Sequence, residues 1–293
     1  MMLRLTGTKI LPANHASTDQ SSTNLGQGKY IHMTNKILTI DNKKLSLDIS
    51  GSGKPIVLFH SLLADSSSFD PLSTDLVKTH QVISLNLPGF EGSDFVGGDL
   101  NTIADHIAKG IESLHLSEKP IFLGNGYGGF IALITSIRHP NLASRLVLAD
   151  CGAMFSEPGR AAFRGMSAAA KEKGLVGIAD VAMRRLFAPE FQEQNPVLVA
   201  ERKKRFLALD TETFHGACAA LAALDIRDQL SKVTQPVLVL VGELDEATPS
   251  AMSVELNAGL PNATLNILPG LAHVPQLQAP SIFMDAIRNF INA

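Results

Sequence analysis

Short apolar runs alternate with longer helical patterns along the chain from about residue 36 onward. The short runs are typical of strands that are covered on both faces, as in a parallel sheet flanked by helices. This alternation predicts an α/β domain with a mostly parallel, buried sheet. The expected strands are 36–40, 45–49, 56–59, 82–85, 121–123, 146–148 and 237–241, and the clearest helices are 102–114, 128–137 and 282–291.

The first two expected strands are joined by Asp41-Asn42-Lys43, a sequence that favours a hairpin turn. We therefore expect these two strands to open the sheet as an antiparallel pair.

Residues 155–233 have a different composition from the rest of the chain. They are rich in Ala, Lys and Arg, and they contain no strand-like run until the buried-strand pattern resumes at Pro236. A helical block between two strands of one sheet would lie above the strand ends, where open α/β sheets bind ligands. The sequence thus predicts a core of residues 34–154 and 234–293 and a helical lid of residues 155–233. This lid either has a purely structural role or also contacts substrate.

The first 33 residues are polar, and we expect them to form a disordered tail without a secretion signal. The chain has no run of about 18 apolar residues, the least that spans a bilayer as a helix.

With 293 residues, 45% hydrophobic and 18% charged, it can form one large core. A net charge of −3 gives no basic face for nucleic acid or an anionic membrane. Two distant cysteines favour a reducing cytoplasm and no disulfide.

A tight glycine turn follows the expected strand 121–123 and precedes a helix. Its sequence is Gly124-Asn125-Gly126-Tyr127-Gly128-Gly129, which fits two patterns. One is the dinucleotide fingerprint G-x-G-x-x-G, with Asp150 placed to bind a ribose. The other is the nucleophile elbow, G-x-nucleophile-x-G, with glycine in place of the attacking residue. The fingerprint normally lies in the first strand–helix unit, whereas several strands precede this turn, so the elbow is favoured.

Four further motifs follow other expected strands. They are His60-Ser61-Leu62-Leu63, then 87–93 (LPGFEGS), 242–245 (GELD) and 270–273 (GLAH). In this order, from about residue 36 to the C-terminus, the chain resembles the α/β-hydrolase superfamily, and within it 3-oxoadipate enol-lactonases and their esterase relatives. The resemblance implies a mostly parallel eight-stranded sheet with helices on both faces and an inserted helical lid.

The resemblance also implies site residues. His273 lies where the family places its general base, and Asp245 lies where the acid that orients this base belongs. Asp150 is a second candidate acid that could replace or assist Asp245. The backbone N–H groups of Leu62 and Tyr127 would form the oxyanion hole, which binds the negative oxygen of the transition state.

Gly126 has no atom that could attack a carbonyl carbon. Its freedom of backbone conformation also suits the strained tip of such a turn, so stability alone could explain it. The hydroxyl of Ser61 could reach the pocket or bond to nearby backbone. Cys151 and Tyr127 lie near the elbow but not at its tip, which makes either a poor candidate nucleophile.

Three functions are compatible with these residues. In the first, an enzyme acts on a small carbonyl compound without a covalent serine. His273 would activate a water in the space that the missing side chain leaves, or would remove a proton from the substrate. In the second, the pocket binds a small molecule without chemistry. In the third, a substitution at Gly126 has inactivated a serine hydrolase. The first is favoured because a binding protein has little reason to keep an acid and a histidine in register. No cofactor, metal, nucleic acid or membrane partner is expected, and the sequence does not indicate an oligomeric state.

Overall fold

The computed structural model describes residues 22–25 and 29–293, and the described residues form one sheet of nine strands. The strands run in the order β1-β2-β3-β5-β4-β6-β7-β8-β9. Their bounds are β1 Ser22–Leu25, β2 Lys29–Ile40, β3 Lys43–Gly51, β4 Lys54–Phe59, β5 His80–Leu85, β6 Ile121–Asn125, β7 Arg145–Ala149, β8 Val237–Gly242 and β9 Ala263–Leu268.

The sheet is parallel from β5 through β4, β6, β7 and β8 to β9, and antiparallel at its other end. The expected hairpin joins β2 and β3, with Ile40 opposite Lys43. Asp41 and Asn42 form its turn at φ 49° and 63°, the left-handed conformation that a two-residue hairpin turn requires. The predicted mostly parallel α/β sheet and its antiparallel opening pair are confirmed.

Two details of the sheet differ from the expectation. Strand β1 and the first residues of β2 fall inside residues 1–33, which we expected to be a tail. That expectation is wrong for residues 22–25 and 29–33, where pairing between β1, β2 and β3 orders a polar sequence. Residues 1–21 and 26–28 lie outside the described residues. Strand β1 is thus an addition to the eight strands expected.

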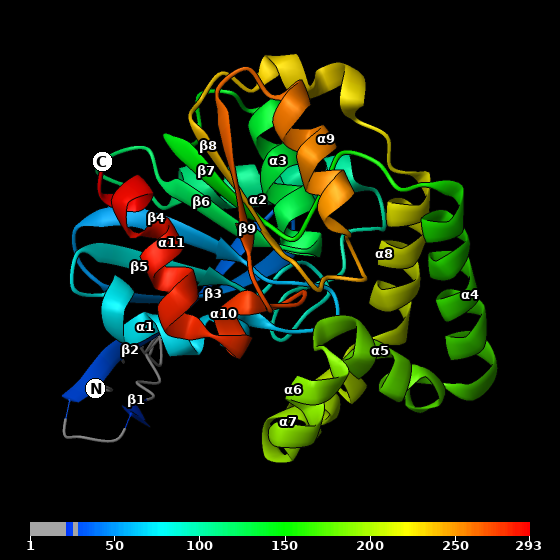
Figure 1. Cartoon of the computed structure of the whole chain (residues 1–293). Coiled ribbons are helices and arrows are strands. Elements are labelled where there is room, and N and C mark those ends of the chain that lie inside the picture. The colour runs from blue at the N-terminus through cyan, green and yellow to red at the C-terminus, as the bar shows by residue number, and fades with distance from the viewer. Residues whose placement is uncertain (1–21, 26–28) are drawn as a thin grey trace, which may run out of the picture.

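Helices cover both faces of the sheet (Figure 1). The expected helices 102–114, 128–137 and 282–291 correspond to α2, α3 and α11. No helix in the described part of the chain has the length and hydropathy needed to cross a bilayer. The helices are η1 Ser66–Phe69, α1 Asp70–Leu76, α2 Leu100–Ser113, α3 Tyr127–Arg138, α4 Glu157–Lys173, η2 Leu175–Ile178, α5 Ala179–Leu186, α6 Pro189–Gln194, α7 Pro196–Leu207, α8 Thr211–Ala223, η3 Arg227–Lys232, α9 Ser250–Gly259, α10 Pro275–Gln278 and α11 Pro280–Asn292.

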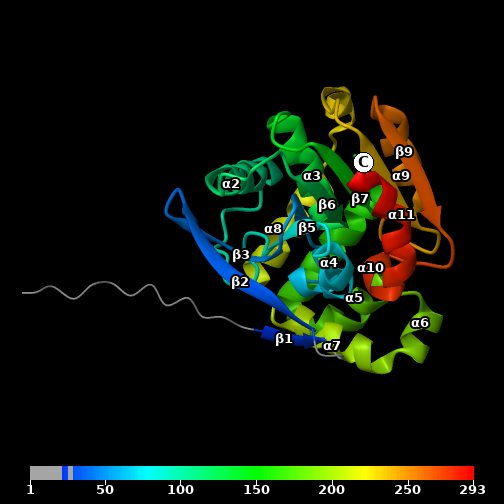
Figure 2. The same ribbon diagram turned by 90° about the vertical axis from the view of Figure 1, so that its left-hand side faces the viewer.

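Alternate side chains of the central strands enter two separate cores. Val57 and Phe59 of β4 pack with α2 and α3, whereas Ile56 and Leu58 pack with α1 and α11. Figure 2 shows α2 and α3 on one side of the sheet and α11 on the other. All four β4 side chains are essentially inaccessible to solvent, and each such burial contributes about 1.5 to 3 kcal/mol. The two cores fix the strand ends from which the site is built.

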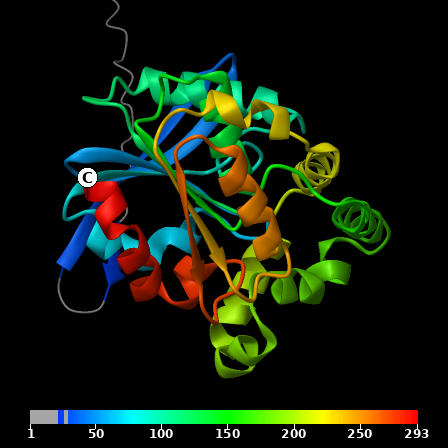
Figure 3. The ribbon, with the colours of Figure 1, turned by 45° about the horizontal axis from the view of Figure 1, so that its top comes forward.

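Helices α4 to α8 lie between β7 and β8 in the sequence and stand to one side of the sheet (Figure 3). Helices α4 and α8 pack against each other. Where this insertion meets the core, Met154 forms an isolated bridge with Asp225, and the amide of Ile226 donates to the carbonyl of Ala153 at 2.9 Å. These contacts hold the two ends of the insertion together next to β7.

Candidate active site

The turn between β6 and α3 places Gly126 at its tip. Gly126 has φ 54° and ψ −121°, a region that residues with a β-carbon rarely adopt. Its amide donates to the carbonyl of Ala149 at 2.9 Å, and its carbonyl accepts from the amide of Gly129 at 2.9 Å. Close packing fixes the turn as well, because a β-carbon on Gly128 would lie 2.1 Å from the carbonyl oxygen of Phe59. The sharp turn expected from the glycine pattern is therefore present.

His273 and Asp245 lie side by side at the carboxyl ends of the strands. The Nδ1 of His273 is 2.9 Å from Oδ2 of Asp245, and both residues are buried. A carboxylate only accepts, so Nδ1 carries the proton and donates to it. Nε2 is then free to accept a proton, which is the state that a general base needs.

The carboxylate of Asp245 is satisfied on both oxygens. Oδ1 accepts from the amides of Ala247 and Thr248 at 2.7 and 3.1 Å, and Oδ2 also accepts from the Thr248 hydroxyl at 2.6 Å. Burial by itself raises the pKa of Asp245, but the charge of His273 and the hydrogen bonds from His273 and Thr248 lower it below its ordinary value. Asp245 is therefore held as an anion. A role for Thr248 was not expected from the sequence.

Ser61 and His273 occupy the space beside Gly126. A β-carbon on Gly126 would lie 2.6 Å from Ser61 Oγ and 2.7 Å from His273 Nε2. These two atoms are themselves 3.4 Å apart and form a hydrogen bond. The space that we expected to hold a water is thus filled by a hydroxyl and an imidazole. Of the two possibilities for Ser61, its hydroxyl reaches the pocket.

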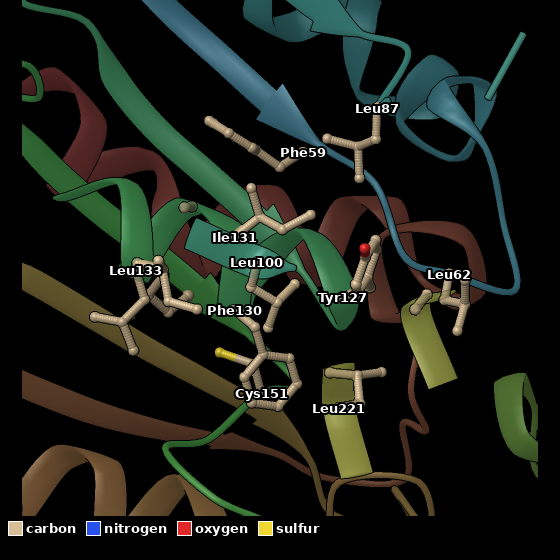
Figure 4. Close-up of a cluster of buried hydrophobic side chains, with 14 of the residues drawn as sticks. Phe59, Leu62, Leu87, Leu100, Tyr127, Phe130, Ile131, Leu133, Cys151 and Leu221 are labelled. Carbon is tan, nitrogen blue, oxygen red and sulfur yellow. The ribbon is translucent and has the colours of Figure 1, made fainter. Parts of the chain in front are cut away.

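A cavity of about 40 Å³ opens in front of these atoms. The backbone N–H groups of Leu62 and Tyr127 lie on residues that line it, and neither donates to a protein atom within residues 29–293. Figure 4 shows the side chains of Leu62, Tyr127 and Leu221 around one part of the buried cluster. The lining is largely apolar, and its members are Ser61, Leu62, Leu63, Gly126, Tyr127, Phe130, Phe155, Ala162, Phe163, Met166, Arg185, Leu221, Ala247, Thr248 and His273.

Asp150 forms no hydrogen bond to His273 within residues 29–293. Its Oδ1 accepts from the amide of Gly242 at 2.8 Å, and its Oδ2 accepts from Nδ2 of Asn125 at 3.2 Å. Complete burial and the negative charge of Asp245 raise the pKa of Asp150 well above its ordinary value. With no exposed surface and both oxygens bonded, Asp150 is also unsuited to the ribose contact of the dinucleotide interpretation.

Asn125 ties the elbow to the histidine loop. Its Nδ2 donates to the carbonyl of His273 at 2.9 Å, and its Oδ1 accepts from Nε2 of Gln276 at 3.0 Å. All three residues are buried. Neither the contacts of Asn125 nor a role for Gln276 was expected from the sequence. The position of Asn125 between two glycines of the elbow was the one available signal.

The other candidate nucleophiles are poorly placed for attack. Cys151 is fully buried beside Phe130, and burial raises the pKa of its thiol (Figure 4). Burial also raises the pKa of the Tyr127 hydroxyl. Neither group forms the reactive anion readily. Within residues 22–25 and 29–293, no group of three or more His, Cys, Asp or Glu side chains could hold a metal ion.

A sharp turn between a central parallel strand and a helix, with an acid and a histidine on later loops, is the arrangement of the α/β hydrolases. The chain belongs to the alpha/beta hydrolase family, whose family model matches residues 56–286.

Relatives of this chain include lactonases and esterases. The 3-oxoadipate enol-lactonase 2 of Acinetobacter baylyi is 27% identical over 194 residues, which cover 66% of this chain and 68% of the relative. A pimeloyl-(acyl-carrier protein) methyl ester esterase of Aeromonas hydrophila is 25% identical over 257 residues, or 84% of this chain and 99% of the relative. The crystal structure of the enol-lactonase of Burkholderia xenovorans LB400 superposes with a TM-score of 0.83 at 23% identity, over 88% of this chain and 100% of that one.

Proposed function

We propose that this protein is an enzyme that acts on a small carbonyl compound, and that His273, oriented by Asp245, is its general base. The observation that carries the proposal is the position of His273. Its Nδ1 bonds to the Asp245 carboxylate at 2.9 Å, while its Nε2 is within 2.7 Å of where a side chain on Gly126 would begin. The base therefore faces the tip of the elbow, where the family carries out its chemistry.

The chemistry starts with proton transfer to Nε2 of His273. Because Gly126 offers no nucleophilic atom, the elbow itself forms no covalent intermediate. The base then acts on another O–H or C–H group, such as a water or an acidic group of the substrate. The amides of Leu62 and Tyr127 are free to bind the resulting oxyanion, and each such donor is worth about 2.7 to 4 kcal/mol in the transition state.

The substrate class follows from the cavity and the relatives. An ester or a lactone is favoured by the names of the lactonase and esterase relatives, and C–C cleavage or proton transfer uses the same groups. We propose that residues 155–233 form a lid over a core of residues 34–154 and 234–293. Side chains of α4, α5 and α8 support this, because Phe163, Arg185 and Leu221 line the cavity together with core residues.

The test is turnover of a panel of p-nitrophenyl esters and lactones by the wild type and by His273→Ala. We expect kcat/KM to fall by about 10² to 10⁴ in the variant. His139→Ala is the matched control, because His139 also pairs with a carboxylate, that of Asp105 at 2.8 Å, but lies away from the cavity. Full turnover by His273→Ala would contradict the proposal. Saturable binding of an apolar ligand without turnover by the wild type would favour the non-catalytic alternative.

A further inference from the structure

We infer that the hydroxyl of Ser61 is the nucleophile of this site, and that it replaces, from the loop after β4, the side chain that Gly126 lacks. The inference rests on the proposed function, since it takes His273 to be the general base. It adds a covalent first half to ester or lactone hydrolysis, and water enters only in the second half.

The arrangement of Ser61, His273 and Asp245 is that of a nucleophile, a base and an orienting acid. Ser61 Oγ is 3.4 Å from Nε2 of His273, and Nδ1 of the same ring is 2.9 Å from Asp245 Oδ2. The nucleophile of an enzyme is recognised by its hydrogen bond to a base that a third group orients, and this distance is often longer without substrate. Such a triad is identified by geometry and not by sequence position.

Ser61 Oγ also lies close to where the side chain of a nucleophile on the elbow would begin. It is 2.6 Å from the point that a β-carbon on Gly126 would occupy. Its side chain lines the same cavity as the amide-bearing residues Leu62 and Tyr127. Leu62 follows Ser61 directly, as Tyr127 follows Gly126. A nucleophile at Ser61 therefore also has an oxyanion donor on the residue that follows it, the backbone amide of Leu62.

The backbone of Ser61 is held firmly. Its carbonyl accepts from the Ala64 amide at 3.2 Å and from Nδ1 of His60 at 3.0 Å, while Nε2 of His60 accepts from the Leu87 amide at 3.2 Å. Both bonds use the neutral imidazole, and burial lowers the pKa of His60 to about 4, so these contacts persist at neutral pH. His60 is thus a positioning residue for Ser61.

No other hydroxyl in the described residues is placed in this way. Thr248 lines the cavity, but its hydroxyl lies on the Nδ1 side of His273, at 3.3 Å, and donates to Asp245. A proton on that hydroxyl cannot pass to Nε2.

The reaction would proceed in two balanced halves. In the first, the Ser61 proton moves to His273 Nε2 as Oγ bonds to the carbonyl carbon, and the carbonyl π electrons move to its oxygen. When this oxyanion collapses, the bond to the leaving alcohol breaks, and the alcohol takes the proton from His273. In the second half, His273 deprotonates a water that attacks the acyl-serine ester. Oγ of Ser61 leaves and recovers the proton.

The experiment is covalent labelling with a fluorophosphonate, followed by peptide mapping by mass spectrometry, together with p-nitrophenyl acetate kinetics. We expect one phosphonylated residue, Ser61, and a burst of p-nitrophenol equal to the enzyme concentration. Labelling should be lost in Ser61→Ala and slowed in His273→Ala, and kcat in Ser61→Ala should fall by at least about 10³-fold. Ser113→Ala on α2, at an exposed residue that does not line the cavity, should behave as the wild type.

Each outcome decides the matter. Turnover that persists in Ser61→Ala, with no label on the wild type, would overturn the serine mechanism while leaving the base function of His273 intact. Absence of both label and turnover in the wild type would overturn the two proposals together. Mapping the wild type does not depend on any variant folding. Ser61→Cys gives a second check, since its thiol would line the cavity beside His273 and should be alkylated by iodoacetamide faster than Cys151 or Cys218, which are buried outside the cavity lining.

Discussion

A side chain at position 126 and the hydroxyl of Ser61 exclude each other, because a β-carbon on Gly126 would lie 2.6 Å from Ser61 Oγ and 3.1 Å from Ser61 Cβ. A contact of 2.6 Å essentially never occurs for a real β-carbon, so one residue must move when the other gains a side chain. Ser61 is buried and held through its backbone, which leaves it little room to retreat. The glycine at the elbow and the serine on the neighbouring loop are therefore complementary.

The first prediction concerns Gly126→Ser. Alone, it should lower the free energy of unfolding by about 1 to 3 kcal/mol, since a non-glycine residue at φ 54° is strained and its β-carbon meets Ser61. Combined with Ser61→Gly, it should recover part of this loss and move the fluorophosphonate label to position 126. Urea unfolding and peptide mapping measure the two effects. Equal stability of the single and double variants would contradict the exclusion.

The second prediction concerns Asp245→Asn. Its amide can present a donor to Nδ1 of His273, which favours the wrong tautomer, and kcat should fall by about 10⁴-fold. The stability effect depends on pH. Because the folded state lowers the pKa of Asp245, its contribution is present above the ordinary pKa of 3.8 and is lost as the pH falls through the lower folded value. Urea midpoints between neutral and acid pH should therefore fall less steeply for Asp245→Asn. Identical slopes would show that Asp245 does not carry this dependence.

Much of this site could be predicted from the sequence, because the strand pattern and the glycine turn determine where its residues lie. Parallel strands end at one edge of the sheet, so residues in the loops that follow the strands, such as Gly126, Asp150 and Asp245, are brought to that edge together. The glycine pattern specifies the turn at Gly126 through φ and close packing, and both are local properties. His273 belongs to this set because its loop follows β9.

What the sequence could not supply depends on tertiary contact. The approach of Ser61 to Gly126 brings together residues 65 positions apart, and no local pattern reports that distance. Asn125, Thr248 and Gln276 are polar loop residues of ordinary type, and only their burial gives them a role. Strand β1 was missed because Ser and Thr there form a strand only by pairing with β2. Strand β9 was also not located, because three of its six residues are exposed and only Leu268 is buried, so it does not resemble a buried strand.

The third prediction concerns Asp150, whose φ of 53° suits Asn almost as well as Asp. Its raised pKa means that its contribution to stability is full below the ordinary value of 3.8 and is lost as the pH rises through the higher folded value. Asp150→Asn keeps a neutral group and an acceptor for the Gly242 amide, so its stability should change little with rising pH. Asp150→Ala leaves the donors on Gly242 and Asn125 unpaired and should cost about 2 to 4 kcal/mol at neutral pH.

Urea unfolding of both Asp150 variants at several pH values tests this. If the free energy of unfolding of the wild type changes as little with rising pH as that of Asp150→Asn, the raised pKa of Asp150 is refuted.

The fourth prediction compares the buried amide side chains of Asn125 and Gln276, which are hydrogen-bonded to each other. Asn125→Ala removes the donor to the His273 carbonyl and leaves Asp150 with one partner fewer, so it should cost about 2 to 4 kcal/mol and lower kcat. Gln276→Leu should be milder. It removes one bond to Asn125 Oδ1, but it also removes an Oε1 that is buried without a partner in the described part of the chain. Thermal unfolding and kcat of the two variants measure which substitution causes the larger loss. A larger loss from Gln276→Leu would reverse the importance assigned to the two residues.

The final prediction concerns substrate charge. Arg185 of α5 is the only Lys or Arg among the residues that line the cavity, and its guanidinium has no ion pair within residues 29–293. An apolar lining strengthens charge attraction, so a substrate carboxylate should bind there. Arg185→Gln should raise KM for mono-p-nitrophenyl succinate by about tenfold or more, the effect of losing one charged hydrogen bond.

The matched control is the neighbouring residue, Arg184, which is exposed and absent from the lining. Arg184→Gln should leave KM unchanged for both mono-p-nitrophenyl succinate and the neutral p-nitrophenyl butyrate. Arg185→Gln should leave KM for the butyrate within about twofold, because the apolar lining that holds a neutral acyl chain is untouched. If both esters lose affinity equally in Arg185→Gln, the guanidinium supports the shape of the lid and does not recognise an anion.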